Sequence, residues 1–194
     1  MFLMKSRTVI CLANGCEEIE ALTVADILRR AGEDVALVSI NETTDVVSSH
    51  KVHIVADAIF ADMDFSETEM LVLPGGMPGS NNLQAYKPLE EMILKFNEEG
   101  KFIAAICAAP KVFGALGLLK GKNACCHPGF EGELIGANVI MDKPAVKDGN
   151  IITGRSMGCA VPFGLTILGA LNGADAANEM AKKLVYMPVE TITE

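Results

Sequence analysis

A cysteine at the junction of two sequence patterns has the clearest chemical potential in this chain. In "KFIAAICAAPKVFGALG", residues 101–117, a short apolar run precedes Cys107, and apolar residues recur at helical spacing after it. The pattern predicts a strand, then a helix starting at Ala108, with Cys107 on the turn between them. The positive end and free N–H groups of that helix favour a thiolate, so we expect a pKa for Cys107 below that of a free thiol. Cys107 is therefore a candidate nucleophile.

A glutamate upstream can supply a proton to this thiolate. At about 100° per residue, the helix expected over residues 17–32 has one apolar stripe. The stripe consists of Glu17, Glu20, Ala21, Val24, Ile27, Leu28 and Ala31. A carboxyl on a buried face has a raised pKa and tends to keep its proton. We therefore expect a protonated Glu20 to donate a hydrogen bond to Cys107 and to exchange its proton with a substrate.

A histidine and several backbone amides are expected on the same rim. Of the three histidines, His127 follows the strand expected at "NACC", residues 123–126, at its carboxyl end. An exposed loop imidazole without a role remains the alternative for His127. Gly75 and Gly76 end the strand "MLVLPGG", and glycine lets a backbone N–H approach a reacting oxygen. The amide of Gly75 or Gly76, together with that of Ala108, is a candidate oxyanion site.

Other chemistries fit the sequence poorly. "GRSMG", residues 154–158, matches the G-x-S-x-G nucleophile elbow, but no histidine follows it, so the order of a serine hydrolase fails. We therefore interpret Ser156 as a turn residue. The triplet "CCH" points alternate side chains to opposite faces, and no second ligand pair has zinc spacing, so no metal site is expected. With no P-loop and no G-x-G-x-x-G fingerprint, we expect no cofactor.

The elements that position these residues alternate between strands and helices. This alternation predicts an α/β sandwich, with a mostly parallel sheet and helices on both faces. The expected strands span residues 7–13, 34–40, 70–76, 101–106 and 123–126, with a short antiparallel excursion over 44–60 and a hairpin over 145–154. Besides the two helices above, helices are expected over 88–100, 161–173 and 174–186. In such sheets ligands bind beyond the carboxyl ends of the strands, where Cys107 lies.

Composition limits the partners and the location. A chain of 194 residues with 50% hydrophobic content suits a single domain over residues 1–194. The net charge is −9 and no basic stripe is present, so neither nucleic acid nor an anionic membrane is an expected partner. No apolar run reaches the roughly 18 residues of a membrane span, and no signal-peptide pattern is present. We expect a cytoplasmic protein whose six cysteines are free thiols.

Five motifs together carry a family resemblance. "GCEEIEA", "LPGGMPGS", "AAICAAP", "CHP" and "ALNG", in this order, resemble the DJ-1/PfpI (ThiJ) superfamily, close to its DJ-1 and YajL branch. The resemblance spans essentially the whole chain. It implies a flavodoxin-like fold, a homodimer, and a site with Cys107 as nucleophile, Glu20 as protonated glutamate and His127 as the nearby histidine. It also implies cofactor-independent glyoxalase activity on methylglyoxal and glyoxal, protein deglycase activity and a role in oxidative stress.

Some positions depart from the family pattern. Ala108 stands where the protease-like branch has a histidine, so peptidase activity is not expected. Close relatives carry arginine in place of His50, and Gly-Pro-Gly in place of residues 156–158. The rim of the pocket is therefore altered, and the substrate preference need not be that of the relatives.

We therefore expect an enzyme of the glyoxalase III type acting on a small aldehyde. The Cys107 thiolate would form a hemithioacetal, and Glu20 and His127 would move protons until lactate or glycolate forms. The alternative is a non-enzymatic oxidative-stress sensor or chaperone-like protective protein that uses the same thiolate. In either case Cys107 should oxidise first, with Cys16 as its main competitor.

An outward apolar pair predicts the assembly. Ile19 and Leu22 fall opposite the buried stripe of the first helix, where solvent-facing residues belong. We expect a homodimer that uses this face.

Overall fold

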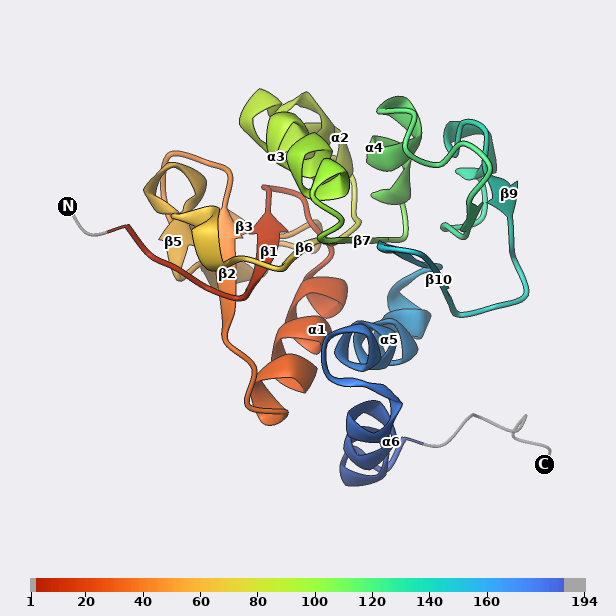
Figure 1. Cartoon of the computed structure of the whole chain (residues 1–194). Coiled ribbons are helices and arrows are strands. Elements are labelled where there is room, and N and C mark those ends of the chain that lie inside the picture. The colour runs from red at the N-terminus through yellow and green to blue at the C-terminus, as the bar shows by residue number, and fades with distance from the viewer. Residues whose placement is uncertain (1–2, 187–194) are drawn as a thin grey trace.

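A seven-stranded sheet forms the centre of the computed structural model, which describes residues 3–186 (Figure 1). Its strands, in spatial order, are β10 (Ala145–Asp148), β11 (Ile151–Gly154), β7 (Phe102–Ile106), β6 (Met70–Leu73), β1 (Thr8–Leu12), β2 (Val35–Ser39) and β5 (Ala58–Ile59). Neighbouring strands are parallel except β10, which is antiparallel to β11. The expected parallel sheet and the hairpin over 145–154 are both confirmed.

The central strands are apolar throughout because both faces of the sheet are covered. In β1, Val9 and Cys11 enter one hydrophobic core, whereas Ile10 and Leu12 enter the other. Successive side chains of a strand point to opposite faces, so a strand buried on both sides has no polar alternation. This explains why "RTVICLA" and "KFIAAI" read as continuous apolar runs.

Helices cover both faces of the sheet (Figure 1). On one face lie α1 (Glu18–Arg30) and α5 (Ala160–Asn172), with α6 (Ala174–Lys183) packed beside α5. The other face carries α2 (Gly79–Ala85), α3 (Lys87–Glu98) and α4 (Pro110–Ala115). The predicted α/β sandwich is confirmed, although α2 had no counterpart in the sequence prediction.

The strand order identifies the fold class. Numbered along the chain, the central parallel strands β1, β2, β6, β7 and β11 lie in the spatial order 2-1-3-4-5. This is the flavodoxin-like order, in which ligands bind near the point where the order reverses, between the first and third strands. Here that point lies between β1 and β6.

Two predicted boundaries were wrong. The helix after Cys107 begins at Pro110 rather than Ala108, because residues 107–109 form a turn. The strand expected over 123–126 is β8 (Asn123–Ala124), which pairs only with β9 (Asn138–Val139), outside the main sheet. Cys125 and Cys126 therefore follow a strand rather than lie in one.

Short elements complete the chain. The antiparallel excursion expected over 44–60 is confirmed for β3 (Asp45–Val47) paired with β4 (His53–Val55), but its last part forms β5, which is parallel to β2 in the main sheet. The 3-10 helices are η1 (Phe60–Asp62), η2 (Phe65–Glu67), η3 (Glu131–Glu133) and η4 (Met157–Cys159). Among residues 3–186, no helix is both long and apolar enough to cross a bilayer. The single domain expected over 1–194 includes residues 1–2 and 187–194, which lie outside this range.

Candidate active site

Cys107 lies on a strained turn directly after β7. Its φ of +65° is in the left-handed region that residues with a Cβ rarely adopt. Neighbouring segments hold this turn from both sides: the Cys107 N–H donates to Gly154 O at 3.0 Å, and the His127 N–H donates to Cys107 O at 2.9 Å. Strain of this kind persists only where the surroundings enforce it, and it concentrates at functional sites. The predicted strand-to-helix elbow is present, and its half-buried thiol remains partly accessible.

Glu20 lies in the first turn of α1 and is only 1% exposed. Its Oε2 accepts a hydrogen bond of 2.8 Å from the Gly75 N–H. Its Oε1 is a buried oxygen with no hydrogen-bond partner in the described part of the chain. Burial raises the pKa of Glu20 to about 7, against the opposing effect of the Gly75 amide and Cys107. The expected buried carboxyl with a raised pKa is confirmed.

The loop after β6 passes between the elbow and α1, and only glycine fits there. A Cβ on Gly75 would lie 2.5 Å from Cys107 Cβ and 2.7 Å from Glu20 Oε2. At Gly76, where φ is +86°, a Cβ would lie 2.4 Å from the Glu17 backbone N. The absence of side chains at these two positions lets Cys107 and Glu20 approach the same stretch of backbone.

The expected lowering of the Cys107 pKa was wrong. Burial is the largest influence, and together with the Glu20 carboxylate it raises the pKa of the thiol to about 12. The backbone N–H of Gly76 and the Ser156 hydroxyl act in the opposite direction but do not outweigh it. A short helix that starts at Pro110 cannot offset this desolvation. When Glu20 carries a proton, its repulsion of the thiolate vanishes, so these two acids titrate as a coupled pair.

His127 and Ser156 come from two other segments of the chain: His127 lies three residues past β8, and Ser156 lies two residues past β11. His127 Nδ1 is 3.0 Å from Ser156 Oγ. The Ser156 hydroxyl in turn donates toward Cys107 Sγ, at 4.0 Å. The structure thus links His127 to Cys107 through Ser156, a residue interpreted from the sequence as part of a turn only.

The sequence did contain a signal for Ser156. "GRSMG" begins at Gly154, the last residue of β11, and β11 is the parallel neighbour of β7. Residues just beyond the carboxyl ends of adjacent parallel strands lie side by side. The motif does not make Ser156 a nucleophile, but the sheet topology places Ser156 beside Cys107.

Of the three backbone amides expected to bind an oxyanion, the structure leaves those of Gly76 and Ala108 available. The Gly75 N–H is occupied by Glu20, so the expectation that it serves an oxyanion is not supported by this geometry. The Gly76 N–H is near enough to Cys107 Sγ to stabilise its charge. The Ala108 N–H donates to no backbone carbonyl among residues 3–186. Gly76 and Ala108 therefore remain as donors toward an oxygen formed next to the sulfur.

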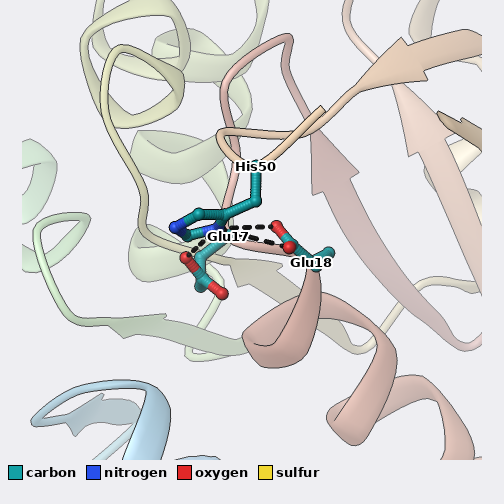
Figure 2. A group of neighbouring side chains, drawn as sticks. All are labelled: Glu17, Glu18 and His50. Atoms are coloured by element: carbon teal, nitrogen blue, oxygen red, sulfur yellow. Dashed lines mark hydrogen bonds and ion pairs between the residues drawn. The ribbon is translucent and has the colours of Figure 1, made fainter. Parts of the chain in front are cut away.

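The imidazole of His50 and the carboxylates of Glu17 and Glu18 lie close together at the start of α1 (Figure 2). His50, from the turn between β3 and β4, places Nδ1 3.4 Å from Glu17 Oε2 and 3.2 Å from Glu18 Oε1. Burial acts to raise the pKa of Glu18, but hydrogen bonds from its own N–H, Ser48 and His50 outweigh it, so the pKa is lowered. Since the Glu17 N–H donates to Gly75 O at 2.9 Å, this group adjoins the reactive centre.

Comparisons with known proteins agree in sequence and in structure. A family model described as "DJ-1/PfpI family" matches residues 6–170. Protein DJ-1 homolog B of Arabidopsis thaliana is 37% identical over 183 residues, which is 94% of this chain and 42% of that protein. Protein dj-1beta of Drosophila melanogaster is 36% identical over 183 residues, 94% of this chain and 98% of that protein. The chain thus spans less than half the length of the plant relatives it matches.

Two further matches concern structure and activity. The crystal structure of Drosophila melanogaster DJ-1beta has a TM-score of 0.89 at 35% identity, covering 95% of this chain and 100% of that one. The glutathione-independent glyoxalase DJR-1.2 of Caenorhabditis elegans is 28% identical over 184 residues, 95% of this chain and 98% of that protein.

Proposed function

Because the chain belongs to the DJ-1/PfpI family, we propose that it is a cofactor-independent enzyme of the glyoxalase III type, converting methylglyoxal to lactate and glyoxal to glycolate. The observation that carries the proposal is the buried Glu20 beside the accessible thiol of Cys107, since the pair combines a nucleophile with an acid that titrates near neutral pH. The name of the nematode relative, a glutathione-independent glyoxalase, supports the same reaction class.

The reaction begins with addition of sulfur to the aldehyde. At neutral pH a substantial fraction of Glu20 carries its proton, because its pKa is about 7. The Cys107 thiolate attacks the aldehyde carbon, a C–S bond forms, and the carbonyl electron pair moves onto oxygen. The N–H groups of Gly76 and Ala108 stabilise that oxygen, and Glu20 protonates it to give the hemithioacetal.

The second stage moves hydrogen between neighbouring carbons. The Glu20 carboxylate, now a base, removes the proton from the sulfur-bearing carbon, and the hydroxyl proton of that carbon passes to the ketone oxygen, so an enediolate forms with its charge on the oxygen next to sulfur. Protonation of the adjacent carbon from the His127 side gives a thioester of the hydroxy acid. Water then cleaves the C–S bond, releasing lactate and the thiol. The aldehyde carbon is oxidised and the ketone carbon reduced, so the balance requires water but no external oxidant or reductant.

The same addition suits other aldehyde adducts. A protein carrying the early, reversible adduct of methylglyoxal presents an equivalent carbon to Cys107, so we include protein deglycase activity in the proposal. Ala108 does not supply an imidazole next to the nucleophile, and peptidase activity is not part of it.

An oxidation sensor is the second candidate function. Of the six cysteines, Cys107 and Cys159 are the two that are not buried. A partly accessible thiol surrounded by hydrogen-bond donors is also the arrangement that captures an oxidised sulfur. Such a sensor would consume aldehyde or peroxide stoichiometrically rather than turn it over.

The setting of the activity is also proposed. We place the protein in the cytoplasm, where thiols stay reduced, and we treat residues 1–194 as one domain. Ile19 and Leu22 are 47% and 39% exposed on the outer face of α1. We propose that this face forms a homodimer, because two adjacent outward aliphatic side chains lose unfavourable contact with water there.

Turnover decides between the two candidates. The purified chain should convert many equivalents of methylglyoxal to lactate without glutathione, and Cys107→Ser should abolish this conversion. Cys159→Ser removes the other accessible thiol and serves as the matched control, with turnover retained. Consumption of a single equivalent per chain would reject the enzyme, and full activity in Cys107→Ser would reject Cys107 as its nucleophile.

A further inference from the structure

We infer that Ser156 relays a proton between Cys107 and His127, so that the imidazole is a second proton acceptor for the thiol in addition to Glu20. The inference shares one assumption with the proposed function on which it rests, namely that Cys107 reacts as a thiolate. The relay itself is a property of the resting protein and is testable without any turnover.

The hydrogen-bond distances define the path. Ser156 Oγ is 3.0 Å from His127 Nδ1 and 4.0 Å from Cys107 Sγ, so it lies between the two groups. The second distance is long for a hydrogen bond, but catalytic hydrogen bonds are often loose in the free enzyme and tighten in complexes. The ends of the path are also fixed, since the His127 N–H donates to Cys107 O at 2.9 Å. A shift of one residue is therefore transmitted to the other.

The topology explains why a serine can serve here. Ser156 has an extended backbone, with φ −171° and ψ −179°, two residues beyond β11. Since β11 and β7 are parallel neighbours, this position lies beside the elbow of Cys107. A short hydroxyl side chain on an unstrained backbone both donates and accepts, which a relay requires.

The proton transfer balances without another reactant. The thiol proton passes to Ser156 Oγ while the original hydroxyl hydrogen passes to His127 Nδ1. The products are a thiolate, a neutral serine and an imidazolium, whose Nδ1–H now donates to Oγ as the O–H donates to sulfur. The Ser156 donation toward Sγ seen in the structure is the direction that this second state requires. The same hydroxyl favours the ionised thiol, in opposition to burial and Glu20.

The route also has a role distinct from that of Glu20. Glu20 is 1% exposed, so protons that it takes from sulfur remain inside the site. His127 is exposed and can exchange its proton with water. The serine would thus give the half-buried thiol a second proton path, through an exposed imidazole, without moving Glu20 from its contact with Gly75.

Alkylation kinetics test the relay directly. The rate of Cys107 modification by iodoacetamide, followed by intact mass and peptide mapping across pH 5–9, reports thiolate without substrate. Ser156→Ala should slow modification at neutral pH by roughly tenfold, the effect of one hydrogen bond to a charged group. His127→Gln should slow it similarly, and the double variant should be no slower than either single one, because both remove the same path. Ser156→Thr keeps the hydroxyl and should restore most of the rate.

Controls separate the relay from the proposed reaction. Ser66→Ala removes an exposed hydroxyl far along the chain and should leave the profile unchanged. Nitrogen-15 NMR of His127 provides a test that does not depend on the folding of Ser156→Ala. In the parent chain and in Ser156→Thr it should show that His127 Nδ1 is hydrogen-bonded. Unchanged alkylation in Ser156→Ala, or additive losses in the double variant, would overturn the relay. If alkylation is coupled as expected but methylglyoxal is not turned over, the proposed reaction fails and the relay stands.

Discussion

Gly75 and Glu20 are joined by a hydrogen bond of 2.8 Å, from the Gly75 N–H to Glu20 Oε2, at a place where a side chain on Gly75 would overlap both that oxygen and Cys107. The bond holds the carboxyl in one orientation before any ligand arrives. It uses one carboxyl oxygen and leaves Oε1 without a hydrogen-bond partner among residues 3–186. An unsatisfied buried oxygen is costly to keep, so its persistence beside the thiol is best explained by chemistry that uses it.

Replacing Gly75 by alanine should disable the site while leaving the fold in place. The new Cβ would lie 2.5 Å from Cys107 Cβ and 2.7 Å from Glu20 Oε2, so the elbow or the glutamate must move. A displacement of about 1 Å costs on the order of 100-fold in rate, which we expect for methylglyoxal turnover. Gly132→Ala is the matched control, because nothing lies within 4 Å of its Cβ and its φ is not positive. Equal turnover in Gly75→Ala would show that the close approach has no role.

Glu20→Gln should remove a pH-dependent loss of stability. The folded pKa of Glu20 is about 7 against an ordinary value of 4.5, so between these values the folded state holds more protons than the unfolded state. The contribution of Glu20 to stability is therefore full below about pH 4.5 and is lost as pH rises through 7, by about 3 kcal/mol in total. A glutamine does not titrate and keeps the size of the side chain.

The measurement is chemical denaturation of both chains from pH 4 to pH 8.5. The free energy of unfolding of Glu20→Gln minus that of the parent should increase from pH 4 to pH 8.5. The variant is therefore expected to gain stability relative to the parent at high pH. A difference that stays constant with pH would mean that Glu20 titrates alike in the folded and unfolded chains. Asp26→Asn, on the exposed part of α1, controls for the loss of a carboxyl.

The positions of Cys107 and Glu20 were predictable because both depend on local patterns. The change from an apolar run to helical spacing locates the elbow, and the α1 stripe places two carboxyls, Glu17 and Glu20, on the buried face. The strand order itself follows the rules for parallel sheets, so the rim where the residues meet could be named in advance.

What the sequence did not predict depends on three-dimensional surroundings. The pKa of Cys107 is set by burial and by Glu20, and neither effect can be weighed from the position of a helix start. The helix begins two residues later than expected because the turn takes residues 107–109. Ser156 was passed over because its motif suggested a different enzyme class, although its contact with His127 arises from β11 lying beside β7.

A charge on the outer face of α1 should break the proposed dimer. Ile19 and Leu22 are 47% and 39% exposed, and a glutamate at each place would put two charges into an apolar contact. We expect the parent chain to have the mass of a dimer by light scattering at micromolar concentration and the Ile19→Glu, Leu22→Glu variant that of a monomer. Ile135→Glu changes an aliphatic side chain that is 58% exposed on another surface and should leave the mass unaltered. A monomeric parent would contradict the prediction outright.

Peroxide should oxidise Cys107 before the other thiols, but the expected competitor changes. Cys16 is fully buried and burial raises its pKa to about 12, so its place ahead of α1 does not make it reactive. Cys159 is the other cysteine that is not buried, and it becomes the relevant rival. A raised thiol pKa in Cys107 means that oxidation proceeds through the minor thiolate form, which the Ser156 hydroxyl and the Gly76 N–H favour.

The order in which the cysteines oxidise distinguishes activation of Cys107 by its neighbouring groups from an effect of solvent exposure alone. If exposure alone decided the rates, Cys107 and Cys159 would oxidise together, whereas the Gly76 N–H and the Ser156 hydroxyl, which favour the thiolate of Cys107 against burial, should put Cys107 first. Glu20→Asp shortens the acid and weakens its hold on a sulfinate at Cys107, so oxidation in that variant should run further, to the sulfonic acid. Peptide mapping after a peroxide titration, with Cys159→Ser as the control chain, gives the sequence of events. Earlier modification of Cys159 than of Cys107 would show that the groups around Cys107 do not activate it.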